Sequence, residues 1–221
     1  MINAIKCQSL FSFNSAYFKN LFSEYEYPWQ ILPDLKRILI RIINQGIEGY
    51  ELISDGILVG KDVSIDKSAH IDGPTIIGHG CAVRHGAYIR GSVILGDGCV
   101  VGNSSEIKNS ILMDRAQAPH FNYVGDSILG EGAHLGAGAI CSNLRSDKGL
   151  VKIKVADGYI DTGLKKLGAI LGDYTEIGCG AVLCPSTIIG KSSTVYPLTM
   201  TRGIYPSGCI VKQDNTVIYK K

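Results

Sequence analysis

The feature of this sequence that most constrains its fold is a six-residue repeat between Val59 and Pro119. Every sixth residue is large and apolar until the last position, and the residue four places later is mostly small or β-branched. Gly or Asp often follows the large apolar residue. Such a repeat is one sequence signature of a parallel β-helix. The repeat positions are Val59, Ile65, Ile71, Ile77, Val83, Ile89, Leu95, Val101, Ile107, Met113 and Pro119.

A period of six matches neither the 3.6-residue period of an α-helix nor the two-residue period of a strand. It matches a short strand followed by a corner, where Gly or Asp gives the backbone freedom to bend. Hexapeptide-repeat proteins, which this stretch resembles, form a triangular prism with three hexads in each coil. The resemblance implies an all-β fold, a left-handed parallel β-helix in which residues eighteen apart stack about 4.8 Å apart.

Composition and charge narrow the classes of partner. The formal net charge of +2 predicts neither nucleic acid nor a membrane surface as a partner. No apolar run approaches the roughly 20 residues that span a bilayer, and the chain start lacks a signal pattern. The seven cysteines are odd in number without a CxxC motif, which predicts reduced thiols and a cytoplasmic location. Cys81 and Cys99 are expected to stack as buried thiols, with a disulfide as the alternative.

Residues 1–56 lie outside the regular repeat, and their pattern of apolar residues predicts a helical N-terminal region. Residues 15–22 form one predicted helix, and a second helix follows Asp34 and ends at Gly46. The second helix has one apolar stripe, at Leu35, Ile38, Leu39, Ile42 and Ile43. We interpret this region as a cap over the open end of the β-helix, which would hide strand edges from other chains. An oligomerisation arm is the alternative.

The β-helix is expected to cover residues 57–200. The regular sixes falter late in the repeat, and the next clear members, Leu129 and Leu135, predict a coil about two residues short. A polar, basic insertion at 143–168 then interrupts the pattern. Long loops that leave a rigid coil usually carry function or flank a site. Residues 201–221 are expected to form an extended C-terminal tail.

Charged residues at outward repeat positions indicate a candidate site. Arg90 and Lys108 are eighteen residues apart, so we expect them to stack, and Asp72 adds a carboxylate to the same face. Like charges without partners one strand apart are mildly destabilising, and an anionic ligand such as a phosphate would relieve that cost. His120 takes an outward position after Pro119. Taken alone, each of these residues could equally be a solvated surface residue.

The run from Arg90 to Asn143 resembles the acetyltransferase domain of the bifunctional N-acetylglucosamine-1-phosphate uridylyltransferase/glucosamine-1-phosphate N-acetyltransferase family. The match is most specific in the block HFNYVGD at 120–126, followed by LGAG at 135–138. It covers about half of the chain well and the coils after Leu167 more loosely. We expect no uridylyltransferase domain within these 221 residues, which lack its Gly-rich nucleotide loop.

The resemblance implies an acetyltransferase that uses acetyl-CoA as co-substrate and acts on an amino-sugar phosphate, as in UDP-N-acetylglucosamine biosynthesis. It makes His120 the general base that takes a proton from the attacking amine, a transfer that suits imidazole at neutral pH. It implies substrate binding by Arg90, Lys108, Tyr123, His134 and Lys166, the first two through a phosphate. It implies acetyl-CoA binding by Ala137, Asn143, Cys179 and Pro197, with Asn143 and the backbone near Ala137 polarising the thioester carbonyl. It implies no metal, and a homotrimer in which a neighbour's wall encloses the pantetheine arm.

Several residues depart from the pattern of that family. His134 stands where the family usually has an Asn that touches the sugar, Leu144 replaces a Tyr, and Asn109 replaces the second of two lysines. These changes lie near the acceptor or the donor arm, while His120 is retained. Acetyl transfer is therefore better supported than the identity of the sugar, and N- or O-acetylation and the acyl chain length stay open.

Two other classes of protein remain as alternatives. A non-catalytic assembly or regulatory module would resemble the β-helical tails of sugar-1-phosphate nucleotidyltransferases, which share the region Tyr27-Pro28-Trp29. A γ-type carbonic anhydrase would bind zinc through three histidines at subunit interfaces. His85 and His120 are suitably spaced for two of these, but Gly125 stands where the third is expected.

Overall fold

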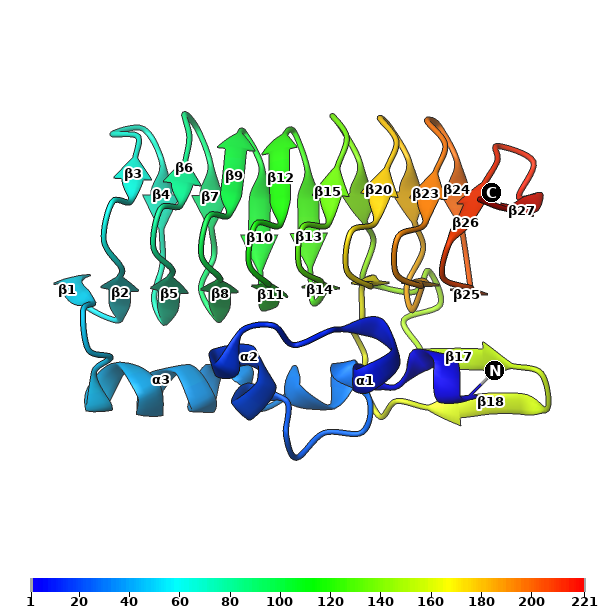
Figure 1. The fold of residues 1–221 in the computed structure, drawn as a ribbon, viewed down its shortest axis with the longest axis horizontal. Coiled ribbons are helices and arrows are strands. Elements are labelled where there is room, and N and C mark those ends of the chain that lie inside the picture. The colour runs from blue at the N-terminus through cyan, green and yellow to red at the C-terminus, as the bar shows by residue number, and fades with distance from the viewer. Residues whose placement is uncertain (1, 221) are drawn as a thin grey trace.

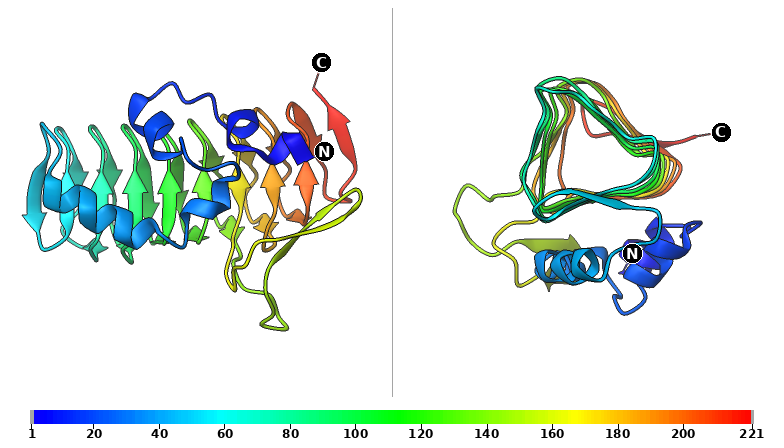
Figure 2. Two further views of the ribbon diagram at one scale, coloured as in Figure 1. Left: turned by 90° about the horizontal axis from the view of Figure 1, so that it is seen from below. Right: turned by 90° about the vertical axis from the view of Figure 1, so that its left-hand side faces the viewer.

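The computed structural model describes residues 2–220. Three of the four sheets in this range are wound into one left-handed β-helix (Figure 1). Seen along its axis, the β-helix is a triangular prism with one sheet on each wall (Figure 2). The predicted fold class is confirmed. We name the walls sheet A, sheet B and sheet C.

Successive strands step from wall to wall, so strands that are neighbours in one sheet belong to successive coils. Sheet A contains, in spatial order, β1 (Glu51–Ser54), β2 (Ile57–Val59), β5 (Thr75–Ile77), β8 (Val93–Leu95), β11 (Ser110–Leu112), β14 (Ile128–Leu129), β19 (Ile170–Leu171), β22 (Ile188–Ile189) and β25 (Ile204–Tyr205). Sheet B contains β3 (Ser64–Ile65), β6 (Ala82–Val83), β9 (Val100–Asn103), β12 (Gln117–His120), β15 (His134–Leu135), β20 (Glu176–Ile177), β23 (Thr194–Val195), β26 (Cys209–Val211) and β27 (Val217–Tyr219). Sheet C contains β4 (His70–Ile71), β7 (Tyr88–Ile89), β10 (Glu106–Lys108), β13 (Tyr123–Gly125), β16 (Ile140–Cys141), β21 (Val182–Leu183) and β24 (Met200–Thr201).

The coils differ in length, and paired residues are eighteen, seventeen or sixteen apart outside the coil that carries the insertion. In the early coils paired residues are eighteen apart, as predicted. Leu95 then pairs with Leu112, only seventeen residues on, because the corner between β10 and β11 is one residue shorter. The inward residues of the next positions are therefore Leu112 and Ala118. The predicted inward positions Met113 and Pro119 are wrong, since a one-residue shift turns each side chain to the other face.

The interior of the prism is filled by stacked aliphatic side chains. On the inner face of sheet A, Leu95, Leu112 and Leu129 follow one another and are at most 1% exposed. Cys81 and Cys99 are buried free thiols, and their Sγ atoms donate to backbone carbonyls 3.0 and 3.1 Å away. One inward apolar residue per strand therefore builds a continuous core along the axis.

The N-terminal helices lie lengthwise along the outer face of sheet A (Figures 1 and 2). This face presents a large apolar side chain in coil after coil, including Ile76, Ile94 and Ile111, and such a surface needs cover in water. The predicted cap over the end of the β-helix is therefore wrong in position. The antiparallel strands β1 and β27 pair with the ends of sheets A and B instead. The helices are η1 (Ile2–Ile5), α1 (Cys7–Leu10), α2 (Ala16–Leu21), η2 (Pro28–Ile31) and α3 (Leu35–Gln45).

Helix α3 forms where the apolar stripe predicts it. Leu35 and Leu39 are fully buried against sheet A, and Ile38 is 9% exposed. The helix ends at Gly46, whose φ of 73° is a conformation that favours glycine. Burial of this stripe, rather than intrinsic propensity, supplies most of the stability of so short a helix.

The insertion at 143–168 folds into an antiparallel hairpin of β17 (Lys152–Val155) and β18 (Gly158–Asp161). Val151 and Ile153 are buried in the same cluster as the N-terminal helices, so the hairpin extends the cover of sheet A. Only the base of the insertion lies beside sheet C. Most of the insertion therefore has a packing role, contrary to the expected flank of a site.

The coils continue past the expected boundary at residue 200. Strands β25 and β26 extend sheets A and B as far as Val211, and β27 then turns back antiparallel to β26. The predicted extended tail is thus mostly part of the β-helix. None of the helices within residues 2–220 is long and apolar enough to cross a membrane.

Candidate active site

Most of the residues predicted to carry function lie along the two edges of sheet C. The outward side chains between these edges come from successive strands, because Tyr88 pairs with Glu106, Glu106 with Tyr123 and Tyr123 with Ile140. We call this strip, made of Tyr88, Glu106, Tyr123 and Ile140, the sheet C face. In contrast to the outer face of sheet A, it is covered by none of the helices formed within residues 2–220 (Figure 2).

The first edge is the corner where sheet B turns into sheet C. The Gly138 N–H donates to the carbonyl of His120 at 2.9 Å, and the Gly180 N–H donates to that of Ala137 at 2.8 Å. The Leu198 N–H likewise donates to the carbonyl of Cys179 at 2.9 Å, with Pro197 one residue before it. We call the resulting line of stacked residues the His120 column. Its members are His85, Asn103, His120, Ala137, Cys179 and Pro197.

His120 is exposed at the end of β12, so its ring is accessible to a ligand. Buried Asn122 fixes the backbone around it. The Asn122 Oδ1 accepts from the His120 N–H at 3.0 Å, and its Nδ2 donates to the carbonyls of Gly136 and Ala139 at 2.8 and 3.2 Å. One side chain therefore ties the turn that carries His120 to the turn that carries Ala137.

The second edge is the corner where sheet C turns into sheet A, and it holds the two predicted phosphate ligands. The Arg90 guanidinium donates to Glu106 at 2.7 Å and lies 5.8 Å from the centroid of the Tyr88 ring. The Lys108 Nζ lies 3.2 Å from the Asp126 carboxylate. The two cations stack in the predicted column, but the expectation that they lack partners is wrong. The seventeen-residue coil brings a carboxylate beside Lys108, and Glu106 lies beside Arg90.

Asp126 is the centre of a polar network at this edge. Its side chain is 7% exposed and accepts from Lys108, from Asn109 at 2.8 Å and from Asn143 at 2.5 Å. The Asn143 Nδ2 also donates to the Tyr123 hydroxyl at 3.1 Å. Burial raises the pKa of that hydroxyl, so it remains protonated at neutral pH. Both hydrogens of the Asn143 amide are thus committed to Asp126 and Tyr123 in this structure, and its donation to a thioester carbonyl stays a prediction that would require one of these bonds to be exchanged.

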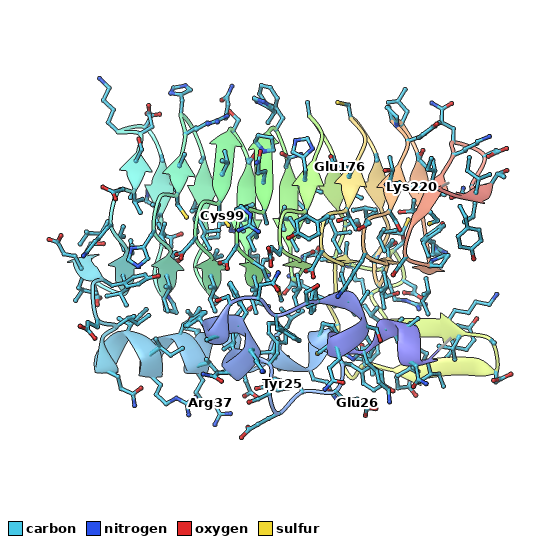
Figure 3. The ribbon with its side chains drawn as sticks, viewed as in Figure 1. Tyr25, Glu26, Arg37, Cys99, Glu176 and Lys220 are labelled. Atoms are coloured by element: carbon cyan, nitrogen blue, oxygen red, sulfur yellow. The ribbon has the colours of Figure 1, made fainter. Side chains whose placement is uncertain are left out.

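The remaining predicted residues divide between the two sides of this strip. Lys166 is exposed, and its backbone pairs antiparallel with that of Leu144 at the base of the insertion, next to Asn143. His134 lies on the outer face of sheet B instead, where its Nδ1 is 2.9 Å from the carboxylate of Glu176. Figure 3 labels Glu176, which belongs to β20. The structure therefore gathers Arg90, Lys108, Asn143 and Lys166 at one edge of sheet C, and His120, Ala137, Cys179 and Pro197 at the other. Tyr123 belongs to the sheet C face between them, and its hydroxyl reaches Asn143.

His85 and His120, the pair considered for a zinc site, lie in one column two coils apart. Within residues 2–220, no three His, Cys, Asp or Glu side chains come together as metal ligands. The structure thus provides no ligand set for the carbonic anhydrase alternative in the described part of one chain.

Sequence reasoning gave no role to Glu106, Asp126 or Asn122. Asp126 is eighteen residues after Lys108, a spacing that could have predicted a contact between them. Because this coil has only seventeen residues, Asp126 stacks with Asn109 and reaches Lys108 from the neighbouring position. Glu106 is two residues before Lys108, where strand alternation puts both side chains outside. The structural role of Asn122 could not be recognised from the sequence, because the hydrophobic pattern does not predict an amide at an inward position.

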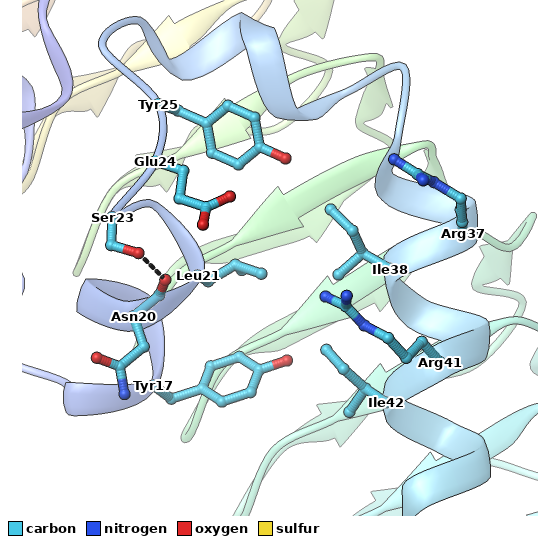
Figure 4. Close-up of a pocket in the computed structure, with 10 residues that line it drawn as sticks. All are labelled: Tyr17, Asn20, Leu21, Ser23, Glu24, Tyr25, Arg37, Ile38, Arg41 and Ile42. Carbon is cyan, nitrogen blue, oxygen red and sulfur yellow. Dashed lines mark hydrogen bonds between the residues drawn. The ribbon is translucent and has the colours of Figure 1, made fainter.

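A sizeable cavity lies away from sheet C, between α2 and α3 (Figure 4). The apolar side chains of Leu21, Ile38 and Ile42 line it together with the guanidinium groups of Arg37 and Arg41. The cavity shares no residue with the two edges of sheet C, and so takes no part in the candidate site.

Comparison with known proteins finds that the chain is similar to part of several bifunctional enzymes. It is 37% identical over 86 residues to a bifunctional sugar-1-phosphate nucleotidylyltransferase/acetyltransferase of Sulfurisphaera tokodaii, covering 39% of this chain and 21% of that protein. It is 33% identical over 113 residues to the bifunctional protein GlmU of Methanocaldococcus jannaschii, covering 50% of this chain and 25% of that protein. The matches thus span about a quarter of the length of these curated relatives.

Among solved structures, the UDP-N-acetylglucosamine acyltransferase of Campylobacter jejuni superposes with a TM-score of 0.52 at 14% identity. The superposition covers 71% of this chain and 67% of that one, and it supports the fold. The family model described as the GMPPB C-terminal domain matches residues 71–210, which include both edges of sheet C. This match extends over well more than half of the sequence, and the chain therefore belongs to the GMPPB C-terminal domain family.

Proposed function

We propose that this chain is an acetyl-CoA-dependent acetyltransferase that acts on an amino-sugar phosphate. The observation that carries the proposal is the convergence of residues distant in sequence on the two edges of one open face. The predicted base and three of the four predicted acetyl-CoA residues share the His120 column. Arg90, Lys108, Tyr123 and Lys166, four of the five predicted substrate residues, lie toward the opposite edge together with Asn143, while His134 lies apart on sheet B. The name of the Sulfurisphaera tokodaii relative, which includes both a sugar-1-phosphate nucleotidylyltransferase and an acetyltransferase, supports the same reaction class.

In the proposed reaction, the amine nitrogen of the sugar attacks the thioester carbonyl carbon, a C–N bond forms and the C–S bond breaks. His120 takes the proton that the amine loses and can return it to the departing thiolate. The Ala137 N–H donates to no residue among 2–220, so it is available for the oxygen that gains negative charge. Arg90 and Lys108 would hold the phosphate, with Glu106 and Asp126 limiting the net charge.

The test is a thiol-release assay with acetyl-CoA and a panel of sugar phosphates, glucosamine 1-phosphate first. His120→Ala is expected to lower turnover by about 10²- to 10⁴-fold, with the fold and acetyl-CoA binding retained. His85→Ala is the matched control, because it removes an exposed imidazole from the same column. Near-normal turnover in His120→Ala would remove this residue from the mechanism.

A homotrimer would complete the site. The sheet C face is open, and Phe121, Leu198 and Met200 beside the His120 column are 58%, 74% and 58% exposed. These apolar side chains fit an adjacent copy of the chain, whose wall would enclose the pantetheine arm. Sedimentation equilibrium tests this, since a monomer at micromolar concentration contradicts it. Six of the seven cysteines are buried free thiols, which fits the proposed cytoplasmic location.

A non-catalytic assembly module is the second candidate. It is favoured by the pairing of Arg90 with Glu106 and of Lys108 with Asp126, because neither cation then requires an anionic ligand. Thermal melting with acetyl-CoA separates the two candidates. An enzyme is stabilised in proportion to the logarithm of the ligand concentration, and a silent module shows no shift.

A further inference from the structure

Asp126 joins residues of three successive coils at the Lys108 edge of sheet C. It lies in the corner after β13, with a positive φ of 49°. Lys108 and Asn109 reach it from the coil before, and Asn143 reaches it from the coil after. Since its side chain is only 7% exposed, these contacts replace most of its hydration. A buried carboxylate with three donors holds all three side chains in place.

The carboxylate determines which end of the Asn143 amide a ligand can meet. The Asn143 Nδ2 donates to the Asp126 Oδ2 and to the Tyr123 hydroxyl, which uses both of its hydrogens. A flipped amide would set its oxygen against the carboxylate, where two acceptors repel. The Oδ1 atom is therefore the hydrogen-bonding end left for a ligand, and it can only accept.

The same carboxylate reduces the positive charge that Lys108 presents. The Lys108–Asp126 pair is well shielded, with side chains 24% and 7% exposed. The Arg90–Glu106 pair is more open, at 42% and 34%. Before a ligand arrives, Arg90 and Lys108 are thus each balanced by one carboxylate, and of these two pairs the Arg90–Glu106 pair is the more open to solvent and separates more easily.

We propose that Asp126 is a positioning residue with two effects. It orients the Asn143 amide so that the amide presents a hydrogen-bond acceptor to a ligand, and it partly neutralises the positive charge of Lys108. This inference rests on the proposed function and deepens it. The edge then favours a ligand that carries an N–H or O–H donor beside its anionic group, over a simple anion. An amino sugar or hydroxy sugar phosphate has that chemistry, whereas inorganic phosphate offers the anion alone.

The test compares Asp126→Asn with Asp173→Asn in the full chain. Asp173 is a matched control, because it is also a buried corner carboxylate with a lysine beside it, Lys191 at 3.7 Å, with side chains 1% and 27% exposed. It lies at the corner between sheets A and B, away from the site. Both changes remove one buried negative charge and keep the size of the side chain.

Inorganic phosphate is the first probe, titrated by calorimetry. Asp126→Asn is expected to bind it ~3- to 10-fold more tightly than the unaltered protein, because Lys108 loses its counter-ion. Asp173→Asn is expected to bind it unchanged. Equal or weaker binding in Asp126→Asn, an equal gain in Asp173→Asn, or no phosphate binding by the unaltered protein would overturn the proposal.

The separate effects on kcat and KM give a second readout, which would not change if Asp126 had a merely structural role. In Asp126→Asn, kcat for the sugar phosphate is expected to fall about tenfold or more while KM does not rise. A parallel loss in Asp173→Asn would mean that both effects come from lost stability. If the unaltered protein binds phosphate as described but acetylates no sugar phosphate, the proposed function is wrong and the titration still decides the role of Asp126.

Asn143→Asp provides a variant that leaves Asp126 in place. It puts a second carboxyl group where the amide donated, and two buried carboxyl groups in contact share one proton, so no net charge is added until that proton is lost. Relative to the unaltered protein, phosphate affinity in Asn143→Asp is therefore expected to fall as the pH is raised, and this change remains measurable if Asp126→Asn does not fold. A ratio of the two affinities that does not change with pH would overturn the contact between the two residues.

Discussion

Asn122→Ala is the substitution that most directly tests how the His120 corner is held. The inward position that Asn122 occupies is filled by small residues in neighbouring coils, by Ala87 and Ser105 before it and by Ala139 and Ala181 after it. Alanine therefore suits the backbone at this corner. The substitution removes the three hydrogen bonds of the amide and introduces no steric clash.

The magnitude follows from the contacts that are lost. The amide accepts from the His120 N–H at 3.0 Å and donates to the carbonyls of Gly136 and Ala139 at 2.8 and 3.2 Å. At about 1 kcal/mol of net stabilisation for each hydrogen bond, the expected loss is about 3 kcal/mol. In a chain of this length that corresponds to a fall in Tm of roughly 6–12 °C.

Urea unfolding followed by circular dichroism measures the change in the free energy of unfolding. Thr199→Ala is the matched control, since Thr199 has the same inward position and its hydroxyl makes one long hydrogen bond of 3.5 Å. It is expected to lose less than about 1 kcal/mol. A loss of under about 1 kcal/mol for Asn122→Ala, or equal losses for both variants, would refute the assigned role of the amide.

Three further changes test the coil, its cover and its buried thiols. Gly102→Ala is expected to yield no soluble folded protein, because the added Cβ would overlap the carbonyl of Pro119 in the next coil. Normal expression of this variant would contradict the close approach. Ile111→Asp puts a charge between sheet A and the N-terminal helices, so the free energy of unfolding measured in urea is expected to fall by about 4 kcal/mol or more. A fall of less than about 1 kcal/mol would mean that the helices do not cover this face. Burial raises the pKa of Cys7 and Cys141 to about 12, above the ordinary value of 9.0, so the folded state keeps protons that the unfolded chain loses. Stability is then complete below about pH 9 and falls by up to about 1.4 kcal/mol per pH unit for each thiol as the pH rises toward 12. Cys141→Ala should make that fall less steep, and an unchanged slope in reducing buffer would contradict the burial effect.

Much of the candidate site was predictable because repeat position alone decides which residues stack. The hexads placed Arg90 above Lys108, and the block at 120–126 picked out His120 and Tyr123. Their partners were not predictable in the same way. Glu106 and Asp126 neutralise the two cations, and one of these pairings depends on a coil that is one residue short. A single missing residue in a corner leaves almost no trace in the apolar pattern.

The sequence by itself determined the prism and its contents. A large apolar residue every six positions can be buried only if the chain closes into a coil, so the core, the corners and the order of the strands follow from the repeat. It also determined α3, because its apolar stripe needs a surface to cover.

Only the tertiary structure decided which surface that was and which side chains meet across coils. The outer residues of sheet A are as apolar as its inner ones, so the helices cover that wall instead of the end of the β-helix. Contacts between coils depend on register, and register is set by the summed length of the corners. For that reason the link from Asp126 to Lys108, Asn109 and Asn143 emerged only when the strands were placed side by side.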